Sequence, residues 1–342
     1  MTKKKFLYVV AMLILLFTLN ITKTFAWFTA SNSIELSATS GTWIRPYLVS
    51  GEEFNSITSP VKADIKTVEF MSTIPDLADY KMGINKFDVS KEKDGSVMAW
   101  VENTTEMYIG GRGGIIADQS LNTMFSYYTS VESITFKNVL DTRDTTSAYN
   151  MFLSCVKLLT TDVNKLDTGN IQNFQFMFAN CVSMKELDIS SWNVESAINM
   201  SGMFVNDKEL YTIKLGTKHA EKVKTFENMF KDCPTIAFLN LSHFYTRDAV
   251  NYKGMFKDSR VQELDLSGFK MRADANLSQM FGYMYSLNKV YVSENWSDIV
   301  KTDCLPFWMC RGLTGSTVSE QEGIDMANYD TGYFTFKQME AK

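Results

Sequence analysis

Histidine and cysteine are the residues in this sequence best suited to metal binding, acid–base catalysis or nucleophilic attack. The 342 residues include only two histidines, His219 and His243, and neither stands at the spacing of a zinc-binding motif. The glycine cluster at residues 110–114 lacks the lysine of a phosphate-binding loop and is typical of a turn. The sequence therefore predicts no metal, no cofactor and no imidazole catalysis.

The five cysteines allow two interpretations. Cys155, Cys181 and Cys233 each stand three residues after the phenylalanine of a Met-Phe pair, so they share one structural position. Cys155 and Cys181 could form a disulfide, or they could remain buried thiols that pack as small apolar groups. Cys304 and Cys310 are the better disulfide candidates in an oxidising exterior. With no histidine beside any cysteine, we expect no catalytic thiol and no enzymatic activity.

A repeat of about 26 residues is the strongest pattern in the chain. Met-Phe pairs recur at spacings of 27, 26, 26, 26, 26 and 25 residues. Phe307-Trp308 is interpreted as a decayed eighth copy. The seven pairs begin at Met124, Met151, Met177, Met203, Met229, Met255 and Met280.

A short apolar segment follows nearly every Met-Phe pair at the same offset. Met184, Leu187 and Ile189 show its form, in which the last two apolar residues alternate with a polar one, as in a half-buried strand. We expect each repeat to contain a strand, a turn and a short helical segment that ends near Met-Phe. Stacked repeats would form a parallel sheet, with methionine and phenylalanine filling the layer behind it.

The fold class predicted is an α/β repeat solenoid of the leucine-rich-repeat type. Residues 27–59 are expected to be a linker or an early strand, and residues 60–115 a β-rich N-terminal cap. Residues 116–300 would be the solenoid, and residues 301–342 an irregular C-terminal cap. A column of small polar residues, four positions before each Met-Phe pair, should bond the backbone of the turns. It contains Ser120, Ser147, Asn173, Asn199, Thr225, Asn251 and Asn276.

The first 26 residues are typical of an export signal. Lys3, Lys4 and Lys5 precede an apolar run over residues 6–19, and Thr24-Phe25-Ala26 places small residues before a cleavage position after Ala26. An uncleaved membrane anchor is the alternative. Cleavage would leave 30 basic and 39 acidic residues, a formal charge of −9. That charge disfavours nucleic acid and anionic lipid as partners.

The polar positions of the strands form the predicted binding surface. Because side chains alternate across a strand, these residues should share one solvent-facing side of the sheet. Phe238 and Tyr291 are the aromatic candidates for contact anchors. A solvated sheet with scattered aromatics and no specific partner is the alternative. The candidates are Glu186, Asp188, Lys214, Phe238, Asn240, Glu263, Asp265 and Tyr291, with Thr135 and Lys289 beside them.

The sequence resembles two known groups of proteins. Residues 184–192, continued by 199–204, and residues 261–269 resemble the BspA-like leucine-rich-repeat surface proteins, which have a mycoplasma-type repeat of 26 residues. Residues 25–29 and 34–37 resemble the N-termini of camelysin- and TasA-like matrix proteins of Gram-positive bacteria. The first resemblance implies a secreted or surface-displayed protein that binds a protein or another cell-surface macromolecule, as in adhesion. The second implies, as an alternative, a self-associating matrix or envelope component.

Overall fold

The computed structural model describes residues 45–302, 304–310, 313, 323–328, 330 and 332–338. The chain divides into two units, Met1–Ile44 and Arg45–Lys342. The first unit, which contains the predicted export signal and the cleavage position at Ala26, lies outside the described residues. The second unit consists mostly of short β-strands in small sheets, with few helices among the described residues.

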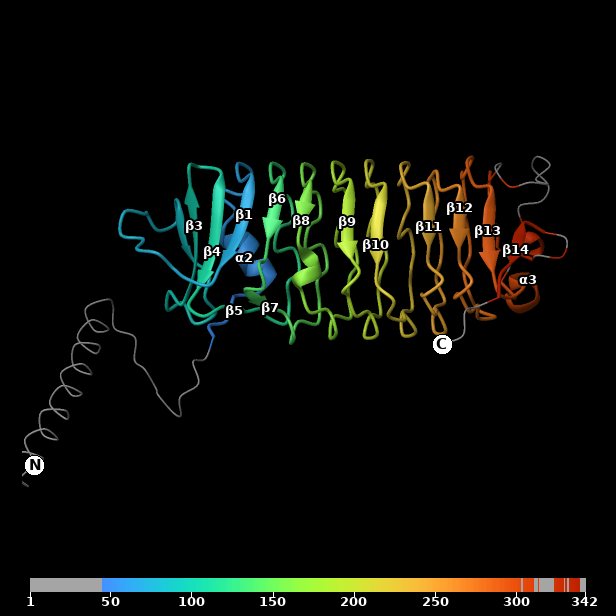
Figure 1. Ribbon diagram of the computed structural model, residues 1–342, viewed down its shortest axis with the longest axis horizontal. Coiled ribbons are helices and arrows are strands. Elements are labelled where there is room, and N and C mark those ends of the chain that lie inside the picture. Colours follow the sequence, from blue (N-terminus) through green and yellow to red (C-terminus); the bar gives the residue numbers. More distant parts are fainter. Residues whose placement is uncertain are drawn as a thin grey trace, which may run out of the picture. The chain divides into compact units, whose positions relative to one another are not determined.

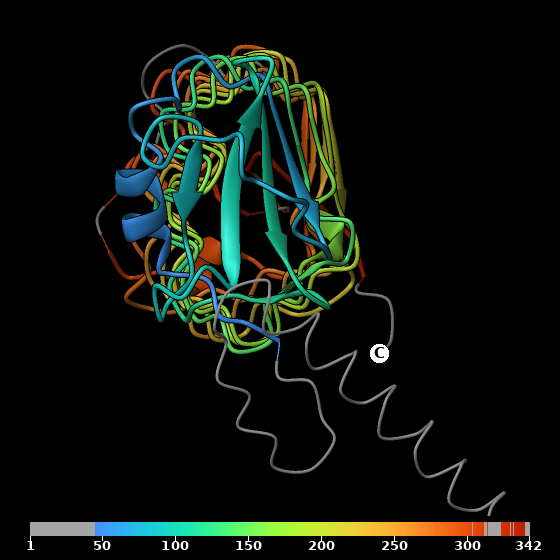
Figure 2. The same cartoon turned by 90° about the vertical axis from the view of Figure 1, so that its left-hand side faces the viewer.

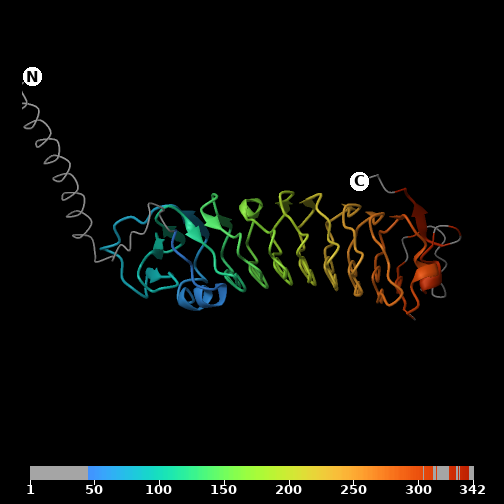
Figure 3. The ribbon, with the colours of Figure 1, turned by 90° about the horizontal axis from the view of Figure 1, so that it is seen from below.

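The described part begins with a short helix and a mixed sheet. Helix α2 (Gly51–Ile57) lies in the segment predicted to be a linker or an early strand, and the Ser50 side chain accepts a hydrogen bond from the Glu53 N–H at 3.2 Å. Its buried Phe54 meets the ring of Phe125 edge-on, with the ring centroids 5.7 Å apart. The helix itself lies on the side of the repeats away from their strands (Figure 3). Four strands follow within residues 60–115: β1 (Thr67–Met71), β2 (Lys86–Asp88), β3 (Val97–Glu102) and β4 (Glu106–Gly111); a fifth, β5 (Ile115–Ile116), lies at the end of this segment.

Each later repeat contributes a short strand at nearly the predicted position, and the paired strands are parallel. The register advances by one repeat between neighbours, so that Leu187 pairs with Ile213, and Leu264 with Val290. Figure 1 shows the strands following one another in chain order. They are β6 (Ser133–Thr135), β8 (Thr160–Thr161), β9 (Glu186–Ile189), β10 (Thr212–Leu215), β11 (Phe238–Asn240), β12 (Glu263–Asp265) and β13 (Lys289–Val292). A further strand, β14 (Phe334–Phe336), lies in the segment predicted to be an irregular C-terminal cap and pairs in parallel with β13.

The remaining elements are small, and the strands do not form one continuous sheet. One sheet has the order β2-β3-β4-β1-β6-β8, a second contains β9 and β10, and a third contains β11 to β14. β5 pairs with β7 in a fourth sheet. The other elements are β7 (Leu140–Asp141), the 3-10 turns η1 (Val163–Lys165) and η2 (Ile324–Met326), and helix α3 (Trp296–Ile299).

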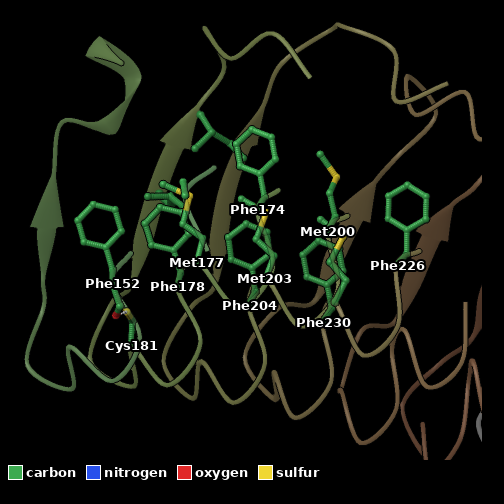
Figure 4. Packing of buried hydrophobic residues seen from close by; sticks show 14 of the residues in the cluster. Phe152, Phe174, Met177, Phe178, Cys181, Met200, Met203, Phe204, Phe226 and Phe230 are labelled. Carbon is green, nitrogen blue, oxygen red and sulfur yellow. Dashed lines mark hydrogen bonds between the residues drawn. The ribbon is translucent and has the colours of Figure 1, made fainter. Parts of the chain in front are cut away.

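The seven Met-Phe pairs form a single internal file, as predicted. Every methionine and phenylalanine of the file is at most 1% exposed. Successive phenylalanine rings stack, for example Phe152 on Phe178 at 5.1 Å and Phe178 on Phe204 at 5.8 Å between centroids (Figure 4). Viewed along the file, the repeats project onto nearly the same outline (Figure 2). One repeat could not bury these rings alone, so the file ties neighbouring repeats together.

The eighth copy is shifted by one residue from the predicted position. Phe307 stacks on Phe281 at 5.1 Å, and the Phe281 N–H donates to the carbonyl of Pro306 at 2.8 Å, so the copy is Pro306-Phe307. Trp308 is 36% exposed and lies outside the file. The position of the eighth copy follows from the stacked ring, because Phe307 continues the buried column of phenylalanine rings.

The predicted helical segment before each Met-Phe pair is wrong. Phe176 and Asn180 have φ angles of 53° and 62°, on either side of Met177-Phe178, and the same two positions have positive φ in every one of the seven repeats. A right-handed helix needs negative φ throughout. The N–H groups instead alternate in direction: Met177 donates to Phe174 of its own turn at 3.2 Å, and Phe178 donates to Met203 of the next repeat at 3.0 Å.

The predicted polar column is confirmed at six of its seven positions; at Ser147, the Tyr149 N–H donates to the Asn122 side chain instead, at 2.9 Å. Successive members form parallel bridges from Ser120 to Asn276. The Asn199 side chain accepts from the Ser201 N–H at 2.9 Å, and Asn251 accepts from Lys253 at 3.1 Å, each closing a tight turn. Asn199 also donates to Gln175 of the preceding repeat at 3.1 Å. The column therefore both shapes the turn and joins the repeats.

Candidate functional site

The outward side chains of β9 to β13, called the strand face below, lie in two rows. Strand register places Glu186 beside Thr212, and Asp188 beside Lys214. After β10 the first row continues as Phe238, Glu263 and Lys289, and the second as Asn240, Asp265 and Tyr291. Within each sheet, the residues predicted to share a face therefore do share it.

Seven of the eight predicted residues are accessible to differing degrees. Phe238 is 66% exposed, the largest value among the exposed apolar side chains of the described residues. Asp188 and Tyr291 are half-buried. Asp265 is only 8% exposed, so its prediction as an exposed residue is wrong. The exposed ones besides Phe238 are Glu186, Lys214, Asn240 and Glu263.

Asp265 is buried because its carboxylate is held by three groups. It accepts hydrogen bonds from the N–H and the hydroxyl of Ser267, at 3.1 and 2.7 Å. It also forms an ion pair with Lys337, whose ammonium group lies 5.8 Å from the centre of the Tyr291 ring. Lys337 is 72 residues away in sequence, so sequence spacing gave no signal for this contact.

Asp188 and Asn240 make the same turn as Asp265. Ser190 donates to Asp188 through its N–H at 3.0 Å and its hydroxyl at 2.6 Å, and the Ser242 N–H donates to Asn240 at 2.9 Å. The hydrogen bonds from Ser190, reinforced by Lys214, lower the pKa of the Asp188 carboxyl. These side chains end the strands and have little freedom left for a partner.

The strand face is broken between β10 and β11, and this break is called the split. The two strands belong to different sheets, and Figure 1 shows a wider gap there than between β11 and β12. Behind the split the same two repeats remain joined, since the Phe204 N–H donates to the Met229 carbonyl at 2.9 Å. The repeats therefore separate only on the strand side.

The sequence of the repeat that contains β10 explains the split. The repeats of β9, β11 and β12 place a buried aromatic residue, Trp192, Phe244 or Phe269, three positions after the last apolar residue of the strand segment. The equivalent residue after β10 is the exposed Lys218. Lysine cannot take the place of a buried ring, so Ile213 and Leu215 of β10 stay half-buried. The Asp-x-Ser turn is also missing, since Lys214 and Gly216 occupy its two positions.

A cavity of about 500 Å³ lies at the split. Its volume is within the range of ligand-binding pockets. Apolar groups come from both edge strands, and polar groups from β11 and β12. The lining residues are Ile213, Leu215, Gly216, Phe238, Leu239, Asn240, His243, Phe244, Glu263, Asp265 and Tyr291. Five of the predicted strand-face residues thus line one cavity, together with His243, to which the sequence analysis assigned no role.

A second break, between β8 and β9, is closed by side chains. The Trp192 ring nitrogen donates to the Val163 carbonyl of η1 at 2.9 Å, and the Ser191 hydroxyl donates to Asn164 at 2.7 Å. Trp192 is 1% exposed. Where an aromatic residue occupies this position, its side chain therefore spans the interrupted strand pairing with a hydrogen bond.

Comparison with known families adds one finding. A family model described as "Mycoplasma protein of unknown function, DUF285" matches residues 119–237 and 209–303. The two ranges together span residues 119–303, more than half of the chain. The chain belongs to this family. No curated protein and no solved structure matches it. The DUF285 match contains β6 to β13 and therefore the whole strand face.

The three cysteines within the matched region are buried, and their environment does not favour the reactive thiolate form. The thiol of Cys155 donates to the Phe125 carbonyl at 3.1 Å, that of Cys181 to Phe152 at 3.3 Å, and that of Cys233 to Phe204 at 2.9 Å. Burial raises the pKa of all three thiols. Reactive cysteines need a lowered pKa and access, so these residues are packing groups.

Cys304 and Cys310, the predicted disulfide pair, are both buried thiols. Cys310 takes the cysteine position of the eighth repeat, where its sulfur lies 3.5 Å from the Met284 carbonyl. The Thr302 hydroxyl lies 3.8 Å from the Cys304 sulfur. The bond between the two cysteines is not formed in the structure.

The position three residues after each Met-Phe phenylalanine, where Cys181 and Cys233 stand, is occupied in one repeat by a carboxylic acid. Asp207 stands where the preceding and following repeats have Cys181 and Cys233, and it is fully buried. Its Oδ1 accepts from the Cys181 N–H at 2.8 Å, and its Oδ2 is buried without a hydrogen-bond partner in the described structure. Burial raises the pKa of the Asp207 carboxyl well above its ordinary value.

Metal binding and membrane spanning find no support in the described residues. His219 packs on Tyr245 at 4.4 Å between ring centres, and His243 lines the cavity two residues away from Tyr245. Across the described ranges, histidine, cysteine and acidic side chains do not gather in a group able to hold a metal ion. No helix among these residues has the length and apolar character needed to cross a bilayer.

Proposed function

We propose that this protein is an exported, non-catalytic leucine-rich-repeat-type solenoid that binds another protein through its strand face at the cell surface. The observation that carries the proposal is the exposure of Phe238 beside polar side chains of the strand face, in the row that continues with Glu263 and Lys289. An exposed aromatic ring surrounded by polar groups is the usual composition of a protein-binding hot spot.

The solenoid part of the proposal rests on the repeated geometry. Strands, polar turns and the stacked phenylalanine rings recur with the same offsets. Such stacks present an extended face that no single repeat provides. Their resemblance to BspA-like surface proteins supports the same fold.

Export and surface display rest on the first 26 residues. A basic start, an apolar run and small residues before Ala26 are the three parts of a secretory signal. The formal charge of −9 that follows cleavage favours solubility over binding to nucleic acid. The buried thiols with raised pKa support a non-catalytic role.

A pull-down with two matched double variants tests the proposal. The full chain would be immobilised and exposed to extracts of host matrix and of bacterial surfaces. We expect saturable binding of a defined partner that Phe238→Ala with Tyr291→Ala weakens by roughly tenfold or more. The control, Tyr127→Ala with Tyr285→Ala, removes two aromatic residues that are 54% and 57% exposed and lie outside the strand face. Equal loss in both variants, or none in the first, refutes the strand face as the binding surface.

A further inference from the structure

The split leaves two strand edges facing one another across the cavity. Where neighbouring strands pair, the backbone carbonyl of the residue before one strand accepts hydrogen bonds from two N–H groups of the next repeat. The Lys185 carbonyl, before β9, accepts in this way from the N–H groups of Tyr211 at 3.0 Å and Thr212 at 3.3 Å. In the described part of the chain, no N–H group of the next repeat reaches the Tyr211 carbonyl in this way. The Thr235 hydroxyl instead donates to the Leu210 carbonyl at 2.7 Å. Unpaired strand edges are templates for an added strand.

The walls of the split provide apolar contacts at the spacing of a strand. Ile213 and Leu215 are half-buried, whereas Leu239 and Leu264, equivalent to Ile213 in later repeats, are buried. Phe238 stands at the opposite edge with 66% of its surface exposed. A strand entering the split would cover Ile213 and Leu215 with every second side chain.

Charge on the strand face favours a basic side chain at this point. Lys214 pairs with Asp188 at 3.9 Å, Lys289 lies 5.0 Å from the Tyr291 ring centre, and Asp265 pairs with Lys337. The exposed Glu263 lines the cavity, and no ion pair reaches it from the described residues. A cationic side chain of a partner would complete the pairing there.

We infer that the split binds an extended, basic segment of a partner protein, which adds its backbone to the edges of β10 and β11. The inference rests on the proposed function and names the form of its partner. Alternate apolar side chains of the segment enter the cavity beside Ile213 and Leu215. A lysine or arginine reaches Glu263, and Phe238 covers the segment from outside.

Peptide titration with backbone-blocked controls tests this mode of binding. The probe is a fluorescently labelled seven-residue peptide of alternating valine and lysine, added to the full chain. Its controls are the same peptide with N-methylated amides and a peptide with glutamine in place of lysine. We expect saturable binding of the first, weakened about tenfold or more by N-methylation and by the Phe238→Ala variant. Glu263→Gln should remove the preference for lysine over glutamine, whereas Glu92→Gln and Tyr285→Ala, which change exposed residues outside the strand face, should leave it unchanged.

Hydrogen exchange and sedimentation distinguish a bound peptide from a second copy of the chain as the occupant of the split. Bound peptide should slow amide exchange in β10 and β11 by roughly tenfold or more, without a comparable change in β13. Equal binding of the N-methylated peptide, or unchanged exchange, overturns the inference. A full chain that dimerises without peptide, and loses the dimer in Phe238→Ala, identifies a second copy as the occupant and also overturns it.

A variant that closes the split separates this inference from the proposed function. Lys218→Phe introduces an aromatic residue at the position of Trp192, Phe244 and Phe269, and we expect it to protect β11 amides and to weaken peptide binding. If those amides become protected and peptide affinity is unchanged, the split is not the binding site. If a protein partner still binds the strand face through Phe238 and Tyr291 while every peptide result is negative, only the extended-segment inference fails.

Discussion

Replacing Asp207 with cysteine should stabilise the protein, and the gain should grow with pH. Asp207 is the one acid in the buried column that also contains Cys181, Cys233 and Ser259, and its Oδ2 is buried without a hydrogen-bond partner in the described structure. In Asp207→Cys, the new thiol can donate to the Phe178 carbonyl, as Cys181 does to Phe152 and Cys233 to Phe204. The Cys181 N–H keeps a partner, because it also lies 3.1 Å from the Phe178 carbonyl.

The expected gain has a constant part and a pH-dependent part. Relieving one buried, unsatisfied polar atom is worth about 1–3 kcal/mol. The pH-dependent part arises because burial raises the pKa of the Asp207 carboxyl in the folded state, while the unfolded chain titrates at about 3.9. Between those two values the folded state binds the extra proton, so wild-type stability falls by about 1.4 kcal/mol per pH unit as the pH rises. The buried thiol stays neutral in this range and carries no such penalty.

Urea unfolding at pH 5, 6, 7 and 8 measures both parts, with circular dichroism as the signal. The matched control is Ser259→Cys in the same column, because Ser259 is also buried with an unpartnered hydroxyl in the described structure but carries no charge. Its change in unfolding free energy should not depend on pH. A destabilised Asp207→Cys variant, or a difference from wild type that is the same at pH 5 and pH 8, refutes the reasoning.

Three further predictions concern contacts that hold the strand face and the turns. Trp192→Phe removes the hydrogen bond to Val163 that closes the break between β8 and β9, so we expect a loss of about 1–2 kcal/mol in urea unfolding; unchanged stability contradicts this role. Lys337→Met leaves the buried Asp265 carboxylate without its ion pair and should cost about 1–3 kcal/mol at pH 7, a loss that adding Asp265→Asn should largely suppress. Tyr127→Gly should raise thermal stability by about 1 kcal/mol, because Tyr127 has a φ of 62° and a side chain that is 54% exposed; a lower melting temperature would count against backbone strain at this turn.

Periodicity allowed the sequence to predict the internal file, the polar column and the position of most strands. Each of these features depends on residue type at a fixed offset, and stacking repeats it without change. The predicted helix failed for a local reason. Asn180, Asn206 and Asp232 favour the left-handed region that interrupts a helix, and this signal was present in the sequence.

For the candidate site, the sequence predicted the direction of the side chains but not how deeply each of them is buried. Alternation along a strand was enough to predict that Glu186, Phe238 and Glu263 point outward. It could not predict that Asp265 is buried, because Lys337 is far away in sequence and reaches it only in the folded chain.

The sequence by itself determined which residues face inward and how the repeats align, because both follow from spacing along the chain. Only the tertiary structure decided where neighbouring strands stop pairing. The exposed Lys218 and the buried Trp192 occupy equivalent positions, yet their effect lies in how two whole repeats meet. Pairing between strands depends on the layer packed behind them, and that layer is assembled from residues of several repeats.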